Sequence, residues 1–334
     1  MVSPGKKEKG ALIMLIVAKD GSGDFTTVQA AVDAAPAEGG EILIRAGEYK
    51  ERVIVNKSRL LIRGESRTGT VITWSACAKD TYPDGREKGT FCSFTLIVTG
   101  DDVTVENLTV RNDAGDGRQV GQAVAVYAAG DRGVWRCCDL IAHQDTLFCG
   151  PTMDNVIQEI APYESTAERV QYSPDSPLTH SRQYFESCMI QGDVDYIFGP
   201  YRCWFEKCLL RMGERGGWYT AANTPEGQDA GFVFHQCRLT GDCAPGAGYL
   251  GRPWRRFART VFLNCEMDQA VAPLGFIDWD ETRVVTPLLG EYGTTGPRAD
   301  QSARHPRQKR LTKKEAAQIT LESVLSGPDG WKPE

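Results

Sequence analysis

Hydrophobic and polar positions alternate in short blocks along most of this chain. From Glu41 onward, β-branched and other hydrophobic residues form runs that Gly, Asp and Asn separate. Such runs predict short β-strands joined by tight turns. We predict strands at 42–44, 53–55, 60–62, 71–73, 94–98, 103–105 and 108–110, after a first strand at 15–18. No helix-length pattern separates them, which argues against a doubly wound sheet and against a barrel of alternating strands and helices.

Helical spacing of hydrophobic residues occurs near each end of the chain. The first segment covers 28–35, where Thr26 or Thr27 can cap the start and Pro36 stops the pattern. The second covers 312–327, which opens with the Thr and Glu of a capping box and leaves through a glycine. We predict a short N-terminal helix and a C-terminal helix that caps or flanks the end of the strand array.

A repeat of the form aromatic-x-x-Cys-x-aliphatic indicates how the strands are arranged. Its members are Trp135 with Cys138, Phe185 with Cys188, Phe205 with Cys208, Phe234 with Cys237, and Phe262 with Cys265. Successive cysteines are 50, 20, 29 and 28 residues apart. Periods of 20 to 29 residues made of short strands are typical of a parallel β-helix, whose coils stack about 4.8 Å apart. We therefore predict an all-β solenoid with the cysteines as an interior ladder of small apolar residues.

The 50-residue interval indicates an insertion, which we place at 151–182, a stretch with four prolines and no repeat. A smaller insertion covers 75–90. We divide the chain into an N-terminal extension, 1–14, and one β-helix domain, 15–334, that carries the larger insertion. Because this insertion joins two acidic motifs, we expect it to project near the functional site.

Composition excludes several classes of protein. The 334 residues are 41% hydrophobic, which is ordinary for a globular chain, and the net charge of -6 argues against a nucleic-acid partner. No apolar stretch approaches the roughly 20 residues of a membrane span. Lys6 to Ala18 superficially resembles a signal peptide but runs into a turn without a small-residue cleavage pattern. This, with an odd number of cysteines, eleven, favours a cytoplasmic location, with secretion as the alternative.

Two acids, two amides and one arginine form the candidate chemistry. Asp145 and Asp195 each lie beside apolar or aromatic residues that would hold a carboxylate in a partly dry place, and Gln122, Gln144 and Arg252 complete the set. Such groups suffice for acyl transfer without serine, cysteine or metal. Gln122 precedes Asp145 by 23 residues, about one coil, and Asp195 falls on the following coil once the insertion is removed.

Other motifs are weaker. The segment 246–251 matches the glycine pattern of dinucleotide-binding proteins, but a proline follows it where a helix should begin. His143 lies beside an acidic motif, where a supporting or surface role fits better than catalysis. We predict no cofactor and no metal site.

Several motifs resemble those of the pectin methylesterase (pectinesterase) family. They lie at 17–29, 47–53, 112–115, 122–125, 144–147, 193–199, 250–254 and 291–296, in the family's order, and include Gln-Asp-Thr-Leu, Asp-Val-Asp-Tyr-Ile-Phe-Gly and Leu-Gly-Arg-Pro-Trp. The resemblance covers nearly all of the chain. It implies a right-handed parallel β-helix and a carboxylic ester hydrolase acting on the methyl esters of polygalacturonate in pectin.

The resemblance also implies residue roles. Asp195 corresponds to the nucleophile, which Arg252 holds, and Asp145 to the acid/base. Gln122 and Gln144 correspond to the oxyanion amides. The substrate-binding residues that it implies are Trp254, Tyr196, Phe198 and Phe276.

The chain departs from the family at three places. Tyr196 stands where Phe is usual, Phe276 stands where Trp is common, and the insertion at 151–182 is longer than the connection in plant members. The last difference leaves open whether the substrate is polymeric pectin or short oligogalacturonides.

The expected chemistry depends on unequal environments for the two acids. We expect Arg252 to keep Asp195 ionised and a drier place to keep Asp145 protonated, so that Asp195 attacks and Asp145 donates a proton. Two alternatives are a lyase or hydrolase on the same kind of coil, and a catalytically silent carbohydrate binder using Trp254, Trp218 and Tyr219. We expect a monomer.

Overall fold

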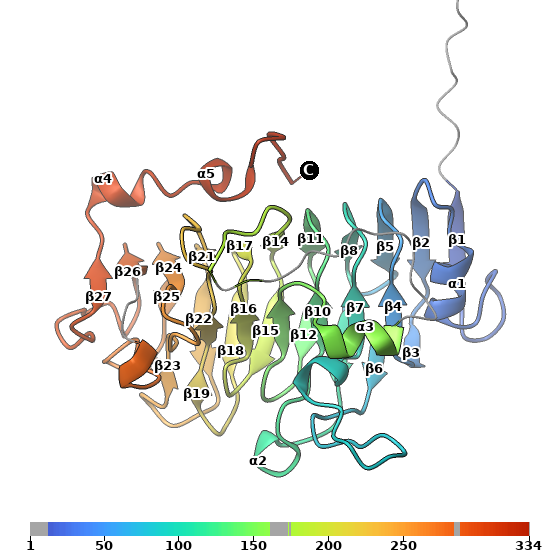
Figure 1. Cartoon of the computed structure of the whole chain (residues 1–334), viewed down its shortest axis with the longest axis horizontal. Helices are drawn as coiled ribbons and strands as arrows, with labels where there is room; N and C mark the ends of the chain where they lie inside the picture. The colour runs from blue at the N-terminus through green and yellow to red at the C-terminus, as the bar shows by residue number, and fades with distance from the viewer. Residues whose placement is uncertain (1–12, 161–172, 174, 284–287, 334) are drawn as a thin grey trace, which may run out of the picture.

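Parallel strands coil into a right-handed β-helix, as predicted (Figure 1). The computed structural model describes residues 13–160, 173, 175–283 and 288–333. Three long parallel sheets run along the axis of the coil, and each coil contributes about one strand to each sheet. Every strand therefore pairs with its equivalents in the neighbouring coils, and a residue keeps one neighbour above and one below.

The three sheets consist of the following strands in spatial order. The first sheet contains β1 (Met14–Val17), β2 (Gly40–Ile44), β5 (Leu60–Gly64), β8 (Thr104–Glu106), β11 (Gly133–Arg136), β14 (Arg182–Glu186), β17 (Arg202–Glu206), β21 (Phe232–His235), β24 (Arg259–Leu263), β26 (Leu288–Tyr292) and β27 (Gln308–Arg310). The second contains β4 (Val53–Val55), β7 (Leu96–Val98), β10 (Val126–Ala128), β13 (Leu147–Cys149), β16 (Ile197–Gly199) and β20 (Thr220–Ala222). The third contains β3 (Gly47–Lys50), β6 (Thr70–Trp74), β9 (Thr109–Asn112), β12 (Asp139–Ile141), β15 (Met189–Gly192), β18 (Leu209–Met212), β22 (Arg238–Gly241) and β25 (Glu266–Met267). A separate pair consists of β19 (Gly217–Trp218) and β23 (Gly248–Tyr249).

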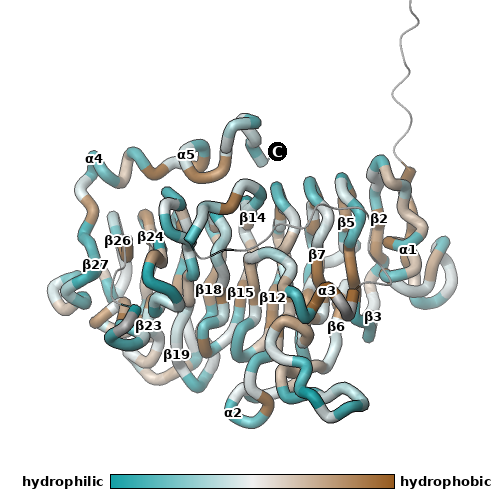
Figure 2. The backbone as a smooth tube through the Cα atoms, viewed as in Figure 1, coloured by the Kyte–Doolittle hydropathy of each residue, from teal (hydrophilic) through white to brown (hydrophobic). Residues whose placement is uncertain are grey.

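The hydrophobic runs match these strands closely. All eight predicted strands are present, some shifted by one or two residues, and within the same part of the chain, up to Asn112, β3 is an additional strand that the pattern did not predict. Helix α1 (Val28–Ala34) starts at the predicted cap, since the Thr27 hydroxyl accepts a hydrogen bond from the Ala30 amide. Figure 2 shows the consequence along the chain: hydrophobic stretches lie in the strands, and the projecting loops are mostly hydrophilic.

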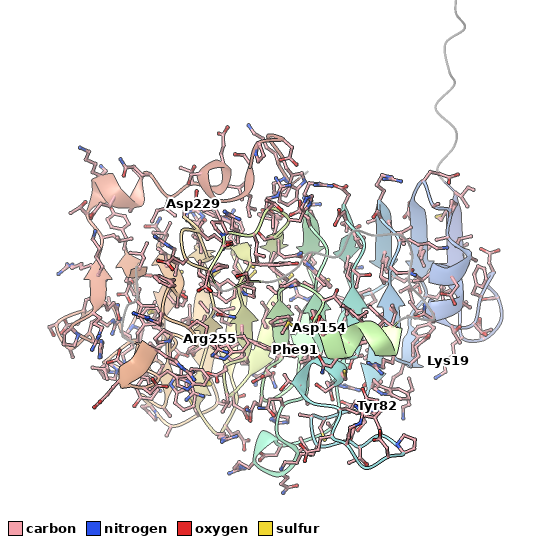
Figure 3. All side chains as sticks on the ribbon, viewed as in Figure 1. Lys19, Tyr82, Phe91, Asp154, Asp229 and Arg255 are labelled. Carbon is pink, nitrogen blue, oxygen red and sulfur yellow. The ribbon has the colours of Figure 1, made fainter. Side chains whose placement is uncertain are left out.

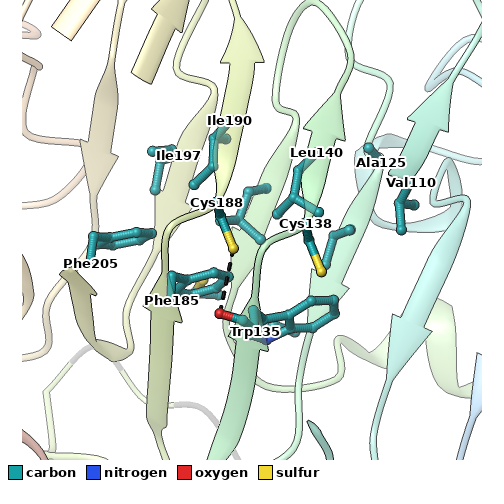
Figure 4. Close-up of a cluster of buried hydrophobic side chains, with 14 of the residues drawn as sticks. Val110, Ala125, Trp135, Cys138, Leu140, Phe185, Cys188, Ile190, Ile197 and Phe205 are labelled. Carbon is teal, nitrogen blue, oxygen red and sulfur yellow. Dashed lines mark hydrogen bonds between the residues drawn. The ribbon is translucent and has the colours of Figure 1, made fainter. Parts of the chain in front are cut away.

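The aromatic and cysteine repeat forms the interior ladder that the spacing predicted (Figure 4). Trp135, Phe185, Phe205, Phe234 and Phe262 are paired in register, and successive rings stack with centroids 5.9, 4.7, 4.4 and 4.7 Å apart. The five cysteines of the repeat are buried, and their thiols donate to backbone carbonyls of the coils. These cysteines therefore serve packing.

The C-terminal helix prediction needs correction. The segment 312–327 forms two short helices, α4 (Lys313–Ala316) and α5 (Leu321–Leu325). The predicted capping box starts α4, but a second one, made by Thr320 and Ser323, starts a new helix, and four residues separate the two helices. The segment runs back along the first sheet, where Val324 and Leu325 join a hydrophobic cluster with Trp204, so it flanks the coil (Figure 1).

The insertion contains helix α3 (Asp154–Ile160), whereas 161–172 and 174 lie outside the described residues. Arg182 belongs to strand β14, so the insertion ends before it. Helix α3 packs against the 3-10 helix η1 (Thr90–Cys92), which follows the smaller insertion. Both cover the second sheet near the front of the molecule, where Figure 3 labels Phe91 and Asp154. Residues 1–12 of the predicted extension 1–14 also lie outside the described residues, and Met14 begins strand β1. The division into domains stays a prediction.

Within the described ranges, no helix is both long and apolar enough to cross a membrane.

Candidate active site

The candidate residues occupy successive coils, as their spacing predicted. The Ala123 amide donates to the Gln144 carbonyl at 3.1 Å, which sets Gln122 beside the coil of Gln144 and Asp145. The Asp145 amide donates to the Val194 carbonyl at 3.0 Å, so Asp195 follows on the next coil. Three neighbouring coils therefore carry the candidate residues just before strands β10, β13 and β16. Gln122 is on the first of these coils, Gln144 and Asp145 are on the second, and Asp195 is on the third.

Both acids lie at strained backbone positions. Asp145 has a φ of 65° and Asp195 a φ of 51°, in the left-handed region that non-glycine residues rarely adopt. Each acid lies two residues before a strand of the second sheet, and Leu147 pairs with Ile197 in these strands. The same backbone turn is therefore made twice on neighbouring coils, so the two side chains leave the coil in the same way.

Arg252 binds Asp195 through two parallel hydrogen bonds. Its Nε donates to Oδ1 at 2.9 Å and its Nη2 donates to Oδ2 at 2.7 Å. The Asp195 side chain is 8% exposed and the Arg252 side chain 19%. Bidentate pairing of this kind fixes the orientation of the carboxylate as well as its charge.

Burial makes both carboxyl groups harder to ionise. The pKa of Asp145 lies well above its ordinary value, first because the group is desolvated and then because the Asp195 charge repels a second negative charge. The pKa of Asp195 is also raised by desolvation, and the hydrogen bonds and charge of Arg252 oppose that rise. We expected the Arg252 charge to keep Asp195 ionised. Arg252 does lower the pKa of Asp195, but burial raises it by more. Asp145, which has no arginine bonded to it, is the acid that burial keeps protonated to higher pH.

The side-chain amides of Gln122 and Gln144 are partly exposed and make no hydrogen bond to any residue that the structure describes. Their backbones are held instead, since the Gln122 carbonyl accepts from the Ala78 amide at 2.8 Å. Gly117, which opens the short helix α2 (Gly117–Val120), lies against Gln144: a Cβ atom there would be 2.9 Å from the Gln144 Cβ. Both amides are thus available to an added ligand.

Four aromatic residues were predicted to bind substrate, and the structure separates them. Trp254 is half-buried, with its ring centroid 6.0 Å from that of Phe198, and both belong to the cluster on the outer face of the second sheet. Tyr196 and Phe276 are fully buried in the interior core, so the prediction that they contact substrate is corrected. The physical reason for Tyr196 is the turn at Asp195, whose left-handed φ of 51° precedes strand β16. After this turn Tyr196 and Ile197 both pack into the interior core, and Phe198 faces outward.

Two residues near the site were missed by the sequence analysis. The centre of the Trp279 ring lies 3.9 Å from the Arg252 guanidinium carbon, and this tryptophan stands three residues after Phe276. Phe91 of η1 contacts Phe148 and Phe198, with ring centroids 4.9 and 6.5 Å apart. In the sequence, the one signal for Trp279 is that a tryptophan ends the segment 274–279, which also contains Phe276. No sequence pattern indicated Phe91.

His143 has a supporting position. Its Nδ1 lies 3.3 Å from Asp193 Oδ2, and this carboxylate raises the pKa of the imidazole. Because the interaction is with Asp193, it leaves Asp145 and Asp195 without a histidine partner among the described residues.

The remaining motifs do not form sites. In the part of the chain that the structure describes, no group of three or more His, Cys, Asp or Glu could hold a metal ion. The glycine pattern at 246–251 contains strand β23, and Arg252 after it binds Asp195. No helix begins there that could receive a pyrophosphate.

The fold and the site together define a parallel β-helix with two buried carboxyl groups on neighbouring coils, one of them paired with an arginine. A model of the Pectinesterase family matches residues 14–152 and 169–328, and its gap falls inside the predicted insertion. The chain belongs to the pectinesterase family.

Several relatives from Arabidopsis thaliana are similar over most of the chain. Pectinesterase QRT1 is 33% identical over 95% of this chain and 78% of its own length, and Pectinesterase 31 is 31% identical over 96% and 94%. Probable pectinesterase/pectinesterase inhibitor 23 is 31% identical, but this chain spans only 53% of its length.

Solved structures agree with the fold. The pectin methylesterase from carrot is 29% identical, with a TM-score of 0.77 over 97% of this chain and 96% of that one. PemA, a pectin methylesterase from Erwinia chrysanthemi, is 27% identical, with a TM-score of 0.75 over 96% and 98%.

The predicted cytoplasmic location is wrong. Plant pectinesterases to which the chain is similar act on pectin of the cell wall, outside the cell. The cysteine argument failed for a physical reason: nine of the eleven cysteines are buried in the coil, where oxidants and partner thiols do not reach them. An odd number of buried thiols therefore carries no information about the compartment.

Proposed function

We propose that this chain hydrolyses the C6 methyl esters of homogalacturonan in pectin or oligogalacturonides, releasing methanol and a free carboxylate. The observation that carries the proposal is the Asp195–Arg252 pair, with the raised pKa of Asp145 on the neighbouring coil. Membership of the pectinesterase family supports it. So does similarity to a pectin methylesterase crystallised with a hexasaccharide, with 27% identity and a TM-score of 0.76.

In the proposed mechanism, an Asp195 oxygen adds to the C6 carbonyl carbon of the ester. The amides of Gln122 and Gln144 donate hydrogen bonds to the oxyanion, and Asp145 gives its proton to the departing methoxy oxygen. The C–O bond to methanol breaks and an acyl-enzyme anhydride remains. Asp145, now ionised, takes a proton from water, whose oxygen attacks the anhydride and frees Asp195.

The protonation states predict a bell-shaped pH dependence for kcat/KM. Activity rises as Asp195 loses its proton, and its raised pKa moves this limb above the range of an ordinary aspartic acid. Activity falls as Asp145 ionises, at a higher pH because its pKa is raised further above the ordinary value. The two groups repel each other, so the limbs report apparent values for the pair.

Substitution of the nucleophile tests the proposal. Asp195→Ala should abolish methanol release from methylated pectin while the fold stays intact by circular dichroism. Asp139→Asn is a matched control, because Asp139 is another buried aspartate bound to an arginine, Arg67 at 2.6 Å, but lies on the third sheet. Methanol release by Asp195→Ala at the wild-type rate would contradict the assignment.

Chain-length analysis separates the alternatives. An esterase leaves the galacturonan backbone uncut, whereas a lyase or hydrolase shortens it, and a silent binder releases no methanol. The family match does not favour these alternatives.

We infer that α3 and η1 restrict how far a substrate chain extends over the second sheet. Val156 and Ile160 of α3 pack into the same cluster as Phe91, Phe148 and Phe198, so the helix covers coils on the N-terminal side of the acids. Replacing Val156 with Asp should loosen α3 and raise the rate on polymer relative to methylated trigalacturonate. An unchanged ratio would remove this inference. A monomeric state also stays a prediction, which light scattering can check.

A further inference from the structure

The guanidinium of Arg252 is covered on both faces by indole rings. Its central carbon lies 3.8 Å from the centre of the Trp218 ring and 3.9 Å from the centre of the Trp279 ring. We call Trp218 and Trp279 the tryptophan clamp. The two indoles come from coils on either side of Arg252, because the Arg252 amide donates to Thr220 and the Ile277 amide donates to Gly251. The remaining edge of the guanidinium binds Asp195.

Each indole of the clamp has its own support. The Trp218 ring stacks on Tyr249 of the next coil, with centroids 6.2 Å apart and an angle of 20°. The Trp279 ring also contacts Arg283, whose guanidinium carbon is 4.7 Å from its centre. The Trp218 Nε1 is buried and has no hydrogen-bond partner among the described residues. Stacking therefore sets the position of the Trp218 indole, although its N–H group is left without a hydrogen bond to the described residues.

Two covered faces change what an arginine side chain can do. An arginine exposed to water has many rotamers, and its ion pairs contribute little because solvent competes for the donors. Indoles attract the cation and exclude water from both faces of its plane. Rotation of the guanidinium out of that plane would require one of the indoles to move.

We propose that Trp218 and Trp279 are positioning residues, which hold the plane of Arg252 so that it keeps both oxygens of Asp195 in one orientation. This inference rests on the proposed function, because it assigns the clamp a part in the attack by Asp195. The competing role is a platform on which a sugar ring stacks. The two roles differ in the step that they affect: a clamp acts through Arg252 on kcat, whereas a platform acts on KM.

A double-mutant cycle between Trp279→Leu and Arg252→Lys tests the proposal. In the wild-type background, Trp279→Leu should lower kcat on methylated trigalacturonate about tenfold, with little change in KM. In the Arg252→Lys background it should lower kcat no further, since a lysine has no plane to hold. Trp279→Phe keeps an aromatic face and should recover most of the loss. The acid limb of the pH profile should also move to higher pH in Trp279→Leu. The leucine keeps the site apolar, so burial still raises the pKa of Asp195, whereas a less well placed Arg252 lowers that pKa by less.

Trp254→Leu is the matched control, because this tryptophan contacts Phe198 and lies outside the clamp. It should raise KM and leave the acid limb in place. If the losses of Trp279→Leu and Arg252→Lys add, or if Trp279→Leu changes KM alone, the clamp is refuted and Trp279 is a platform. If Trp279→Leu does not fold, the same cycle with Trp218→Leu gives the answer from the other face. A wild-type chain that releases no methanol would refute the proposed function itself, whereas additive losses in an active enzyme would refute the clamp alone.

Discussion

Removing one buried hydroxyl group should stabilise this protein. The Tyr196 side chain is fully buried in the interior core, and its hydroxyl has no hydrogen-bond partner among the described residues. Its ring packs beside Tyr219, with centroids 5.6 Å apart. A buried polar group without a partner costs about 1–3 kcal/mol, because it has lost its hydrogen bonds to water. Tyr196→Phe removes this group and keeps the ring.

The expected gain can be worked out from the site. Loss of one oxygen atom leaves a space of roughly 10–15 Å³, which costs about 0.3 kcal/mol. The free energy of unfolding should therefore rise by about 1–2 kcal/mol. Methanol release should change little, since the ring points into the coil and away from the face of Asp195.

Tyr201→Phe is a matched control with the opposite sign. Tyr201 is as fully buried as Tyr196, but its hydroxyl donates to the Ala129 carbonyl at 2.6 Å. Its removal loses a hydrogen bond and leaves that carbonyl unpaired, so we expect a destabilisation of about 1–2 kcal/mol. Urea unfolding followed by tryptophan fluorescence measures both variants, and the midpoints should move in opposite directions at an unchanged slope. If Tyr196→Phe lowers the midpoint as Tyr201→Phe does, the reasoning about the unpaired hydroxyl is refuted.

Three further predictions concern other parts of the structure. The pKa of Asp145 is raised in the folded protein, so the stability of the wild type should fall as the pH rises above about 4, the ordinary aspartate pKa. Asp145→Asn should be inactive. Its melting temperature should exceed that of the wild type at pH 7 and equal it at pH 4. Arg182→Met removes the 2.6 Å partner of the buried Asp131, which keeps only Arg132 at 2.9 Å among the arginines that the structure describes, and should cost about 2 kcal/mol, measured by urea unfolding. Asp329→Asn, at the exposed end of Arg182, should cost under about 1 kcal/mol. Lys207→Asn should raise the melting temperature slightly, because asparagine tolerates the φ of 50° at this turn better than lysine does; an unchanged or lower value would contradict this.

Much of the architecture was predictable from sequence because a solenoid repeats itself. The period of the aromatic and cysteine repeat determines which residues stack, and the observed register pairs Trp135 with Phe185 and Phe185 with Phe205. The same period placed Gln122, Asp145 and Asp195 on neighbouring coils. Short sequence motifs predicted the structure correctly where a single residue determines it, as at Thr27, which caps helix α1. They failed at 312–327, where the second capping box was overlooked.

Other features depended on the direction in which side chains point. The backbone turn at Asp195 leaves this acid at the site while Tyr196 enters the core. Phe276 points inward, whereas Trp279, three residues later, covers Arg252. Secretion could not be judged from cysteines, since their burial was not visible in the sequence.

The sequence by itself determined the coil, its register and the set of polar residues on it, because these follow from spacing along the chain. Only the tertiary structure decided how dry the two acids are, which indoles cover Arg252 and which aromatic rings remain outside. Each of those properties depends on several groups that come from different coils. The pKa of Asp195 is an example, because burial raises it and the Arg252 charge lowers it. Spacing along the chain brings such groups together but does not contain the balance between them.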